Sequence, residues 1–373
     1  METRRLLMTT AVQDKFLAMR KDMNDSLIER DEETTLVLTA LLAGEHVVLI
    51  GPPGTAKTML AETIVDWIDG KRFSMLLNDS TKPDELFGPV SVLGMKADDY
   101  YRIIENTMLD ADVVLLDEIF KGSSMILNTT LKVLNEGTYR NGSKGMVKCP
   151  LKMVIGCSNE YPREAKELAA LFDRFMFRKT VNPVSSESSI ERLMSAPDLT
   201  PQLTTNLPVE ELDGAKNEVK RVEVRGDVQE ASGEIRRRIR RDGVVVGDRR
   251  LRKTYPALQA FAYLNGRDEV TTDDLELLQH MWWSHPDTQG AVADAVVEIA
   301  RPSGLMATQM LAEAKQVVDN CDVKDLAASA IASKKLGEIK KGLNGSSPRE
   351  KEACELVNQM LINLRLASLD AVQ

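Results

Sequence analysis

Short apolar runs alternate with amphipathic helical stretches over the first half of the chain. The apolar runs predict β-strands at His46–Ile50, Phe73–Leu77, Val113–Asp117, Leu151–Cys157 and Phe175–Thr180. After the first of these runs, Ala61, Ile64 and Ile68 share one face of a predicted helix. Strands that alternate with helices in this way predict an α/β domain with a parallel sheet, which we expect to extend to about residue 185.

The pattern becomes purely helical after a proline-containing linker at Val181–Ser186. Within this helical part, Thr271–Asp274 resembles the capping box that begins a helix. Further helices are predicted at Leu305–Val318, Asp322–Gly342 and Pro348–Ala371. We therefore expect an α/β core at residues 1–185, an all-α part at 186–285 and a helical extension at 286–373.

The helices of this extension carry apolar stripes that need a surface to pack against. Leu356, Met360 and Leu364, for example, recur at helical spacing, and a helix with such a stripe is not stable alone. We expect a helical bundle or an arm on a neighbour. The candidate surfaces are the all-α part of the same subunit, a neighbouring subunit or a protein partner.

Composition fits a globular protein, and no membrane-spanning helix is predicted. The chain has 373 residues, of which 43% are hydrophobic and 28% charged, and this balance is typical of two or three globular domains. No apolar run reaches the roughly 18 residues that a membrane-spanning helix needs. The first residues lack the apolar centre of a signal peptide, and the four cysteines show no CxxC pair. We expect reduced cysteines and a cytoplasmic location.

The net charge of −9 argues against a protein that coats nucleic acid, because such binding depends on neutralising phosphates. One region is an exception, since basic residues are crowded between Arg236 and Lys253. A solvated or inter-subunit helix face is the favoured interpretation of this cluster. Docking of nucleic acid or of an acidic protein is the alternative.

The first strand leads into a glycine-bearing loop and a helix, which is the context of a phosphate-binding loop. Its residues are Gly51, Pro52, Pro53, Gly54, Thr55, Ala56, Lys57 and Thr58. Backbone N–H groups of such a loop and the N-terminus of the following helix attract phosphate. Lys57 adds a charge for the β- and γ-phosphates, and the Thr58 hydroxyl is a candidate ligand of Mg²⁺. Ala56 replaces the usual glycine, which predicts a negative φ at this residue.

A second part of the site follows the strand at Val113–Asp117, which ends in two carboxylates. Asp117 is a candidate ligand of Mg²⁺, directly or through water. Glu118 is the candidate base that orients and polarises the attacking water. Together with the phosphate-binding loop, this Walker B element predicts an Mg²⁺-dependent nucleotide hydrolase.

Further segments in a fixed order carry a resemblance to a known family. They are Glu85–Pro89, Leu127–Leu131, Asn135–Arg140, Ser158–Glu160, Leu171–Phe175, Asp248–Arg250 and Asn265–Asp268. This set resembles the MoxR branch of AAA+ ATPases and is most similar to its RavA subgroup, over roughly residues 20–285. The resemblance implies a P-loop NTPase fold, in which an αβα parallel-sheet core is followed by an all-α lid. The helices beyond residue 300 form an extension without a match.

The resemblance also implies roles for residues near the nucleotide. Asn159 resembles sensor 1, an amide that helps to orient the attacking water, although a polar turn residue is the alternative. Ile28 lies in a segment that borders the base in the family and would pack on the adenine of ATP, while a core role is the alternative. Tyr139–Ser143 resembles the hairpin before sensor 1, which would face either a central pore or plain solvent.

The resemblance also implies roles for two arginines, and in each case a second arginine nearby in the sequence is the alternative. Arg174 resembles the arginine finger, which would reach the site of a neighbouring subunit, and Arg178 is the alternative. Arg249 resembles sensor 2, which would contact the γ-phosphate in cis from the lid, and Arg250 is the alternative.

The expected function is ATP hydrolysis that remodels or activates a protein partner. The resemblance implies a homo-oligomer, most often a hexameric ring, and a partner that carries a von Willebrand A-type domain. The two alternatives are a nucleic-acid-stimulated motor, which the net charge disfavours, and a nucleotide-gated scaffold with little turnover.

Overall fold

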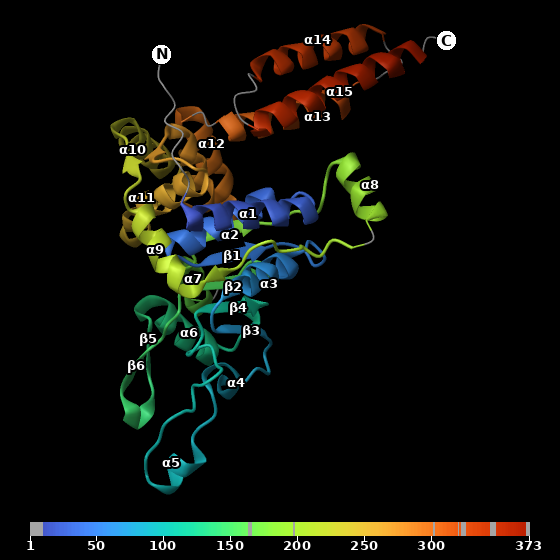
Figure 1. The fold of residues 1–373 in the computed structure, drawn as a ribbon. Coiled ribbons are helices and arrows are strands. Elements are labelled where there is room, and N and C mark those ends of the chain that lie inside the picture. The colour runs from blue at the N-terminus through green and yellow to red at the C-terminus, as the bar shows by residue number, and fades with distance from the viewer. Residues whose placement is uncertain are drawn as a thin grey trace. The chain divides into compact units, whose positions relative to one another are not determined.

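The computed structural model describes residues 10–162, 166–196, 198–300, 303–319, 321, 326–343 and 348–370. The chain divides into two compact units (Figure 1). The first unit contains everything up to Val224, together with Val246–Val270 and His280–Gln289. The second unit contains Arg225–Val245, Thr271–Gln279 and the chain from Gly290 onward.

The first unit is built on a parallel sheet whose strand order is β3-β4-β7-β1-β8. The strands are β1 (Val47–Ile50), β3 (Arg72–Leu76), β4 (Val113–Asp117), β7 (Met153–Ser158) and β8 (Phe177–Thr180). All five predicted strands are confirmed, with ends that differ by two residues at most. The central strands β1 and β7 are buried along their whole length, because helices cover both faces of the sheet (Figure 1).

Several helices accompany these strands, and among them α3 (Lys57–Trp67) confirms the helix predicted after the first apolar run. The others include α1 (Ala11–Ser26), α2 (Asp31–Ala43), α6 (Ser124–Glu136), α7 (Lys166–Arg174), α8 (Glu187–Ser195), α9 (Val209–Val219) and α11 (Asp248–Leu264). The longest of them, α11, packs on α2. The first α11 residues therefore lie beside the chain that enters β1, where Lys253 forms an ion pair of 2.5 Å with Glu45.

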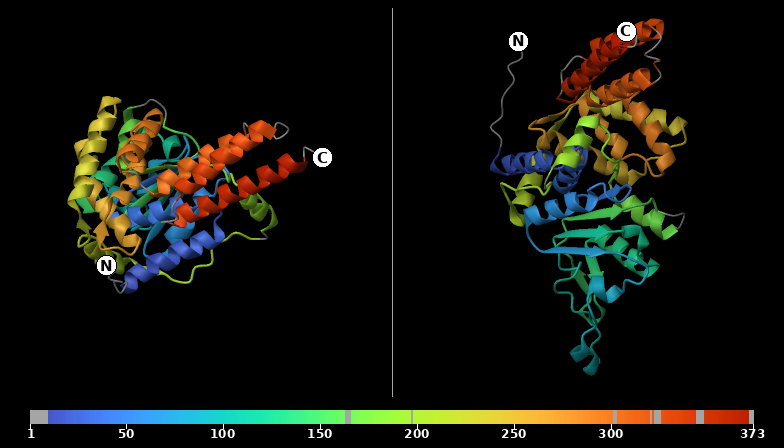
Figure 2. Two further views of the ribbon diagram at one scale, coloured as in Figure 1. Left: turned by 90° about the horizontal axis from the view of Figure 1, so that it is seen from above. Right: turned by 90° about the vertical axis from the view of Figure 1, so that its right-hand side faces the viewer.

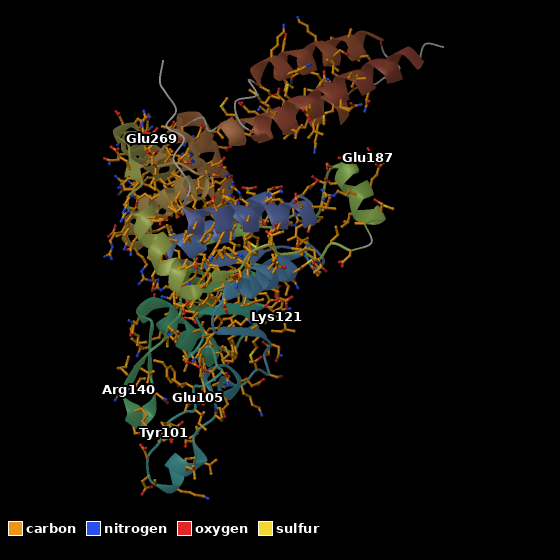
Figure 3. The ribbon with its side chains drawn as sticks, in the orientation of Figure 1. Tyr101, Glu105, Lys121, Arg140, Glu187 and Glu269 are labelled. Atoms are coloured by element: carbon orange, nitrogen blue, oxygen red, sulfur yellow. The ribbon has the colours of Figure 1, made fainter. Side chains whose placement is uncertain are left out.

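An arm extends from the sheet between β3 and β4. It contains α4 (Pro83–Phe87) and α5 (Val92–Lys96), and Ser91 and Tyr101 hydrogen bond across it at 2.9 Å. A hairpin of β5 (Thr138–Arg140) and β6 (Met146–Lys148) lies against this arm. The Asn141 side chain both accepts from the Arg102 N–H at 2.7 Å and donates to the Arg102 carbonyl at 2.9 Å. Figure 3 labels Tyr101 on the arm and Arg140 on the hairpin.

The second unit is helical. It contains α10 (Gly226–Arg241), α12 (Gln289–Ala300), α13 (Ser303–Asp319), α14 (Leu326–Gly342) and α15 (Pro348–Asp370). The predicted capping box is present in part, because Asp274 accepts from the Thr271 N–H at 2.8 Å. The element that follows, Thr272–His280, is a 3₁₀ helix rather than the expected α-helix.

The last three helices pack on one another and lie side by side in two views (Figure 2). Their buried cluster includes Ala314, Leu336, Val357 and Leu364. A helical bundle was one of the two predicted arrangements and is confirmed. Apolar side chains of these helices thus pack on one another within the bundle, while Ile331 and Ile362 remain 70% and 43% exposed. No helix among the described residues is long and apolar enough to cross a membrane.

Candidate active site at the carboxyl edge of the sheet

The phosphate-binding loop connects β1 to α3 and is held tightly at its first residue. A Cβ atom on Gly51 would clash with the carbonyl oxygen of Val181, which follows the neighbouring strand β8. Gly54 has a φ of +79° and no atom within 4 Å of an added Cβ. The loop therefore needs one glycine for close backbone approach and one for a left-handed turn, and it leaves an open cradle at Gly54.

Ala56 has a φ of +62° and a ψ of 18°, so the predicted negative φ is wrong. The left-handed conformation costs an alanine roughly 1–2 kcal/mol because its Cβ crowds the backbone. The prediction treated this cost as prohibitive. The structure shows that the turn into α3 holds an alanine in the left-handed conformation. Strain of this kind is common where backbone geometry serves a ligand.

Lys57 folds back over its own loop. Its Nζ donates to the carbonyls of Gly51 at 2.7 Å and Pro52 at 2.8 Å, and to Asn159 Oδ1 at 3.2 Å. Burial lowers the pKa of this amine, against the opposing pull of the carboxylates Asp117 and Glu118. The lysine is thus a buried cation whose acceptors are neutral oxygens, and a phosphate in the cradle would be a stronger acceptor.

Thr58 and Asp117 meet beside this lysine. The Thr58 hydroxyl donates to Asp117 Oδ2 at 2.9 Å. A hydroxyl and a carboxylate oxygen are hard oxygen donors, the type that Mg²⁺ prefers. Because protein sites for this ion use one or two such side chains together with substrate phosphates and water, the pair next to the phosphate-binding loop fits Mg²⁺.

Glu118 follows Asp117 in a left-handed conformation, with a φ of +51°. This turn aims its carboxylate at Asn159, whose side-chain amide donates to Glu118 Oε1. Lys121 Nζ lies 3.3 Å from the other carboxylate oxygen. The structure therefore brings Lys57, Thr58, Asp117, Glu118 and Asn159 together at the carboxyl edge of the sheet. Every one of them was singled out by the sequence.

Ile28 lies in the loop between α1 and α2 and is buried. Its neighbour Arg30 donates from Nε to the carbonyl of Thr55, at 3.0 Å, within the phosphate-binding loop. The loop that carries Ile28 therefore borders the site. Arg30 ends the segment that the resemblance places beside the base, Leu27–Arg30, but the sequence reasoning gave this arginine no role of its own.

Arg174 and Arg178 differ sharply in their surroundings. Arg178 is fully buried, donates to the carbonyls of Phe172 at 3.1 Å and Phe175 at 3.2 Å, and lies 4.3 Å from the Phe172 ring centre. It is a core residue of its own subunit. Arg174 is partly exposed at the end of α7 and pairs with Asp173 at 3.0 Å. Its Nε has no hydrogen-bond partner among the described residues.

Arg249 and Arg250 differ in the same way. Arg250 is 5% exposed and donates to the carbonyls of Met176 at 2.8 Å and Met281 at 2.6 Å. Arg249 is exposed and donates to Asn135 Oδ1 at 2.5 Å, at the end of α6. Burial lowers the pKa of Arg174, and the charge of Arg249 lowers it further.

The expected contact of Arg249 with the γ-phosphate in cis stays a prediction. In this structure α11 lies beside Glu45, which pairs with Lys253 and precedes β1, whereas the loop follows β1. The four residues of β1 separate the two by about 13 Å at 3.3 Å per residue. Arg174 precedes β8, which pairs in parallel with β1, and so it lies at the same amino edge. Helix α11, which carries Arg249, packs on α2.

The parallel sheet, the phosphate-binding loop and the carboxylate pair define a P-loop NTPase. Comparison with known families is more specific. Residues 14–212 match the family described as the MoxR domain in MoxR-vWA-beta-propeller ternary systems, and residues 227–296 match an AAA lid domain. Since the first match spans more than half of the chain, the protein belongs to the MoxR family of AAA+ ATPases.

Relatives extend the likeness over most of the chain. The uncharacterised protein MJ0079 of Methanocaldococcus jannaschii is 34% identical over 340 residues, covering 89% of this chain and 85% of that protein. The uncharacterised protein YeaC of Bacillus subtilis is 26% identical over 291 residues, or 74% of this chain and 89% of YeaC. A crystal structure of a candidate ATPase from Cytophaga hutchinsonii superposes with a TM-score of 0.60 at 18% identity, covering 78% of this chain and 97% of that one. The last likeness concerns the fold alone.

Proposed function

We propose that the protein hydrolyses ATP at the carboxyl edge of its sheet. The observation that carries this proposal is the cluster of five polar side chains around the open cradle at Gly54. A lysine, a hydroxyl paired with a carboxylate, a second carboxylate and an amide are the parts that phosphoryl transfer to water requires.

Each residue has a task that its contacts support. Lys57 would exchange its bonds to the loop carbonyls for bonds to the phosphates. Glu118 would accept a proton from the attacking water, and Asn159, which already donates to Glu118, would hold both in place. Thr58 and Asp117 would hold Mg²⁺, which when bound neutralises charge that develops on the phosphate oxygens. Ile28 would cover the adenine from the α1–α2 loop.

The two exposed arginines support assembly into a ring, which we take to be hexameric. Arg174 precedes β8 and so lies at the edge of the sheet opposite the phosphate-binding loop. It pairs with Asp173 at 3.0 Å, but its Nε has no hydrogen-bond partner among the described residues. The phosphates bound to a neighbouring subunit would be a further acceptor, so Arg174 would act as the finger in trans and Arg249 beside it. Each site would then be complete only in the oligomer.

We further propose that hydrolysis remodels or activates a protein partner. Apolar side chains are exposed along α5, where Val92, Leu93 and Met95 are 65%, 76% and 60% exposed. Exposed apolar patches of this kind mark protein-binding surfaces. The matched family is described by its occurrence with vWA proteins, which makes a vWA-domain protein the first candidate partner. Membership of the RavA subgroup is part of this proposal, as are the domain boundaries at residues 185 and 285.

A nucleic-acid-stimulated motor is a second candidate because α10 presents a basic face. Arg236, Arg237, Arg240 and Arg241 are all exposed on this helix, while Ile235 and Ile239 on its other face are buried. Stimulation of ATP turnover by single- or double-stranded nucleic acid would favour this candidate. A basal rate unchanged by nucleic acid would favour the protein-remodelling role.

The test of the proposed reaction is phosphate release from ATP with and without Mg²⁺. Lys57→Ala should abolish nucleotide binding and therefore turnover. The matched control is Lys71→Ala, since Lys71 is a lysine at the amino edge of the sheet that pairs with Asp110 at 2.8 Å. Turnover by the Lys57→Ala protein equal to that of the control would refute the proposal. So would a purified wild-type protein that binds ATP with Mg²⁺ but never releases phosphate, which is the behaviour of a scaffold.

A further inference from the structure

The loop between α1 and α2 contacts two segments that are distant in sequence, and both of them border the nucleotide cradle. One is the phosphate-binding loop and the other is the linker at residues 181–186, which leads from β8 to α8. Glu29 and Arg30 make these contacts. We call this pair the Glu29–Arg30 clasp.

Arg30 donates to main-chain carbonyls of three separate segments. Its Nε donates to Thr55 at 3.0 Å, one terminal nitrogen donates to Asn182 at 2.8 Å, and the other donates to the carbonyl of Glu29. The planar guanidinium is suited to such a junction because its donors are fixed in one plane. A lysine offers one nitrogen and could satisfy only part of this set.

Arg30 is only 5% exposed, and among the described residues its hydrogen bonds go to carbonyl oxygens. Burial raises the pKa of Glu33, and the charges of Lys179 and Arg30 oppose that shift. Burial lowers the pKa of Lys57, and the charge of Arg30 lowers it further. Two neighbouring buried cations with neutral acceptors are a costly arrangement that an anion would relieve.

Glu29 secures the other side of the clasp. Its carboxylate accepts from the N–H of Ser185 at 2.9 Å and from the N–H of Ser186 at 3.0 Å. Ser186 in turn caps α8, which begins at Glu187 (Figure 3). Glu29 has a φ of +55°, a conformation that persists only where several contacts hold it in place. The loop is therefore fixed to the linker as firmly as to the phosphate-binding loop.

We propose that Arg30 is a positioning residue for the nucleotide phosphates, an inference that rests on the proposed ATPase function. Arg30 holds the Thr55 carbonyl away from the cradle, so that the following N–H groups face the phosphates. It also supplies a second buried positive charge behind Lys57, which the phosphates neutralise. The Glu29–Arg30 clasp keeps the loop in register with the linker, so that the cradle is preformed before nucleotide arrives.

This role predicts a dependence on phosphate charge that a purely structural arginine would lack. Removing the charge should weaken ATP binding more than ADP binding, because the ligand with more negative charge gains more from Arg30. The weaker ATP binding should appear chiefly as a higher KM. The chemical step depends on Glu118 and Asn159, which Arg30 does not contact, so kcat should change less.

The experiment compares Arg30→Gln and Arg30→Lys with the wild-type full chain. Affinities for ATP and ADP are measured with Mg²⁺ by calorimetry, and KM and kcat by phosphate release. The control is Arg192→Gln, because Arg192 also donates to a carbonyl, that of Asp25 at 2.6 Å, but lies exposed on α8. Arg30→Gln should weaken ATP binding roughly tenfold or more, which is the loss expected for hydrogen bonds from a charged group. Arg30→Lys should fall between Arg30→Gln and wild type, and the control should match wild type.

Two results would overturn the inference. One is wild-type ATP affinity in Arg30→Gln. The other is an equal loss of ATP and ADP affinity in Arg30→Gln. If Arg30→Gln does not fold, wild-type ATP affinity in Arg30→Lys overturns the inference instead, because a lysine can satisfy only part of the hydrogen bonds of Arg30. Failure of the proposed function is distinguishable from these results, because the wild-type protein would then either bind no nucleotide or bind ATP without releasing phosphate. Thermal unfolding of each variant without nucleotide shows whether the fold is intact.

Discussion

The position of Arg174 leads to a sharp prediction about shared active sites. Arg174 and the phosphate-binding loop lie at opposite edges of the sheet, separated by at least the four residues of β1, or about 13 Å. An arginine cannot span that distance within one subunit. Arg174→Ala should therefore leave ATP affinity nearly unchanged and lower kcat by roughly 10³-fold or more, the usual contribution of an arginine finger.

Rings assembled from two inactive variants should recover a calculable fraction of wild-type turnover. Glu118→Gln removes the base but keeps Arg174, whereas Arg174→Ala removes the finger but keeps Glu118. In an equal mixture, a site is intact when an Arg174→Ala subunit receives its finger from a Glu118→Gln neighbour. With random assembly and independent sites this occurs at about one quarter of the interfaces, which should restore about 25% of wild-type turnover.

The assay is phosphate release after the two inactive proteins are mixed, with each protein alone as the control. Native mass spectrometry with ATP reports whether mixed oligomers form. Mixed oligomers without any recovered turnover would refute a finger in trans. A protein that stays monomeric with every nucleotide would do the same.

Three further predictions follow from the described contacts. Arg178→Ala or Arg250→Ala should lower the free energy of unfolding by roughly 3–5 kcal/mol, because each arginine is buried with its hydrogen bonds satisfied. Urea denaturation measures this loss, and a loss below about 1 kcal/mol would contradict the burial. Ala56→Gly should stabilise the protein by up to about 1 kcal/mol, since relief of left-handed strain outweighs the extra entropy of the unfolded chain; destabilisation would contradict the positive φ. Burial alone would raise the pKa of Glu29, but hydrogen bonds from Ser186 and Ser185 lower this pKa to about 2. Its contribution to stability should thus be complete above pH 4.5 and lost as the pH falls toward 2, and Glu29→Gln should flatten stability over that window.

The strands and the chemistry at their carboxyl ends could be predicted from the sequence because both are local signals. Apolar runs such as Val113–Asp117 can only be buried strands in an α/β pattern. Parallel strands bring their carboxyl ends to one edge. Asp117, Glu118 and Asn159 therefore had to meet once the sheet formed.

The choice between neighbouring arginines was harder because it depends on which side of an element each residue faces. For α11, the helical spacing of the sequence does indicate which of the two arginines is buried. Arg250 shares a stripe with Thr254 and Phe261, which are buried, so its own burial follows from the same periodicity. The position of Arg249 at the amino edge could not be found this way, because it depends on how α11 packs against α2.

The conformation of Ala56 and the contacts of Arg30 lay beyond sequence reasoning for different reasons. The first was judged by local sterics, but the turn between β1 and α3 overrides a cost of about 1–2 kcal/mol. The second depends on contacts between segments 25 and 152 residues apart. No periodicity or motif reports such contacts in a single sequence.

The most direct test of the account is the behaviour of Glu118→Gln with ATP and Mg²⁺. The substitution keeps the size of the side chain but removes the proton acceptor that Asn159 contacts. Binding of ATP should remain at wild-type affinity, and phosphate release in a single turnover should fall by roughly 10²–10⁴-fold, the contribution expected of a general base. Wild-type turnover by Glu118→Gln would contradict the assignment of this carboxylate and, with it, the proposed mechanism.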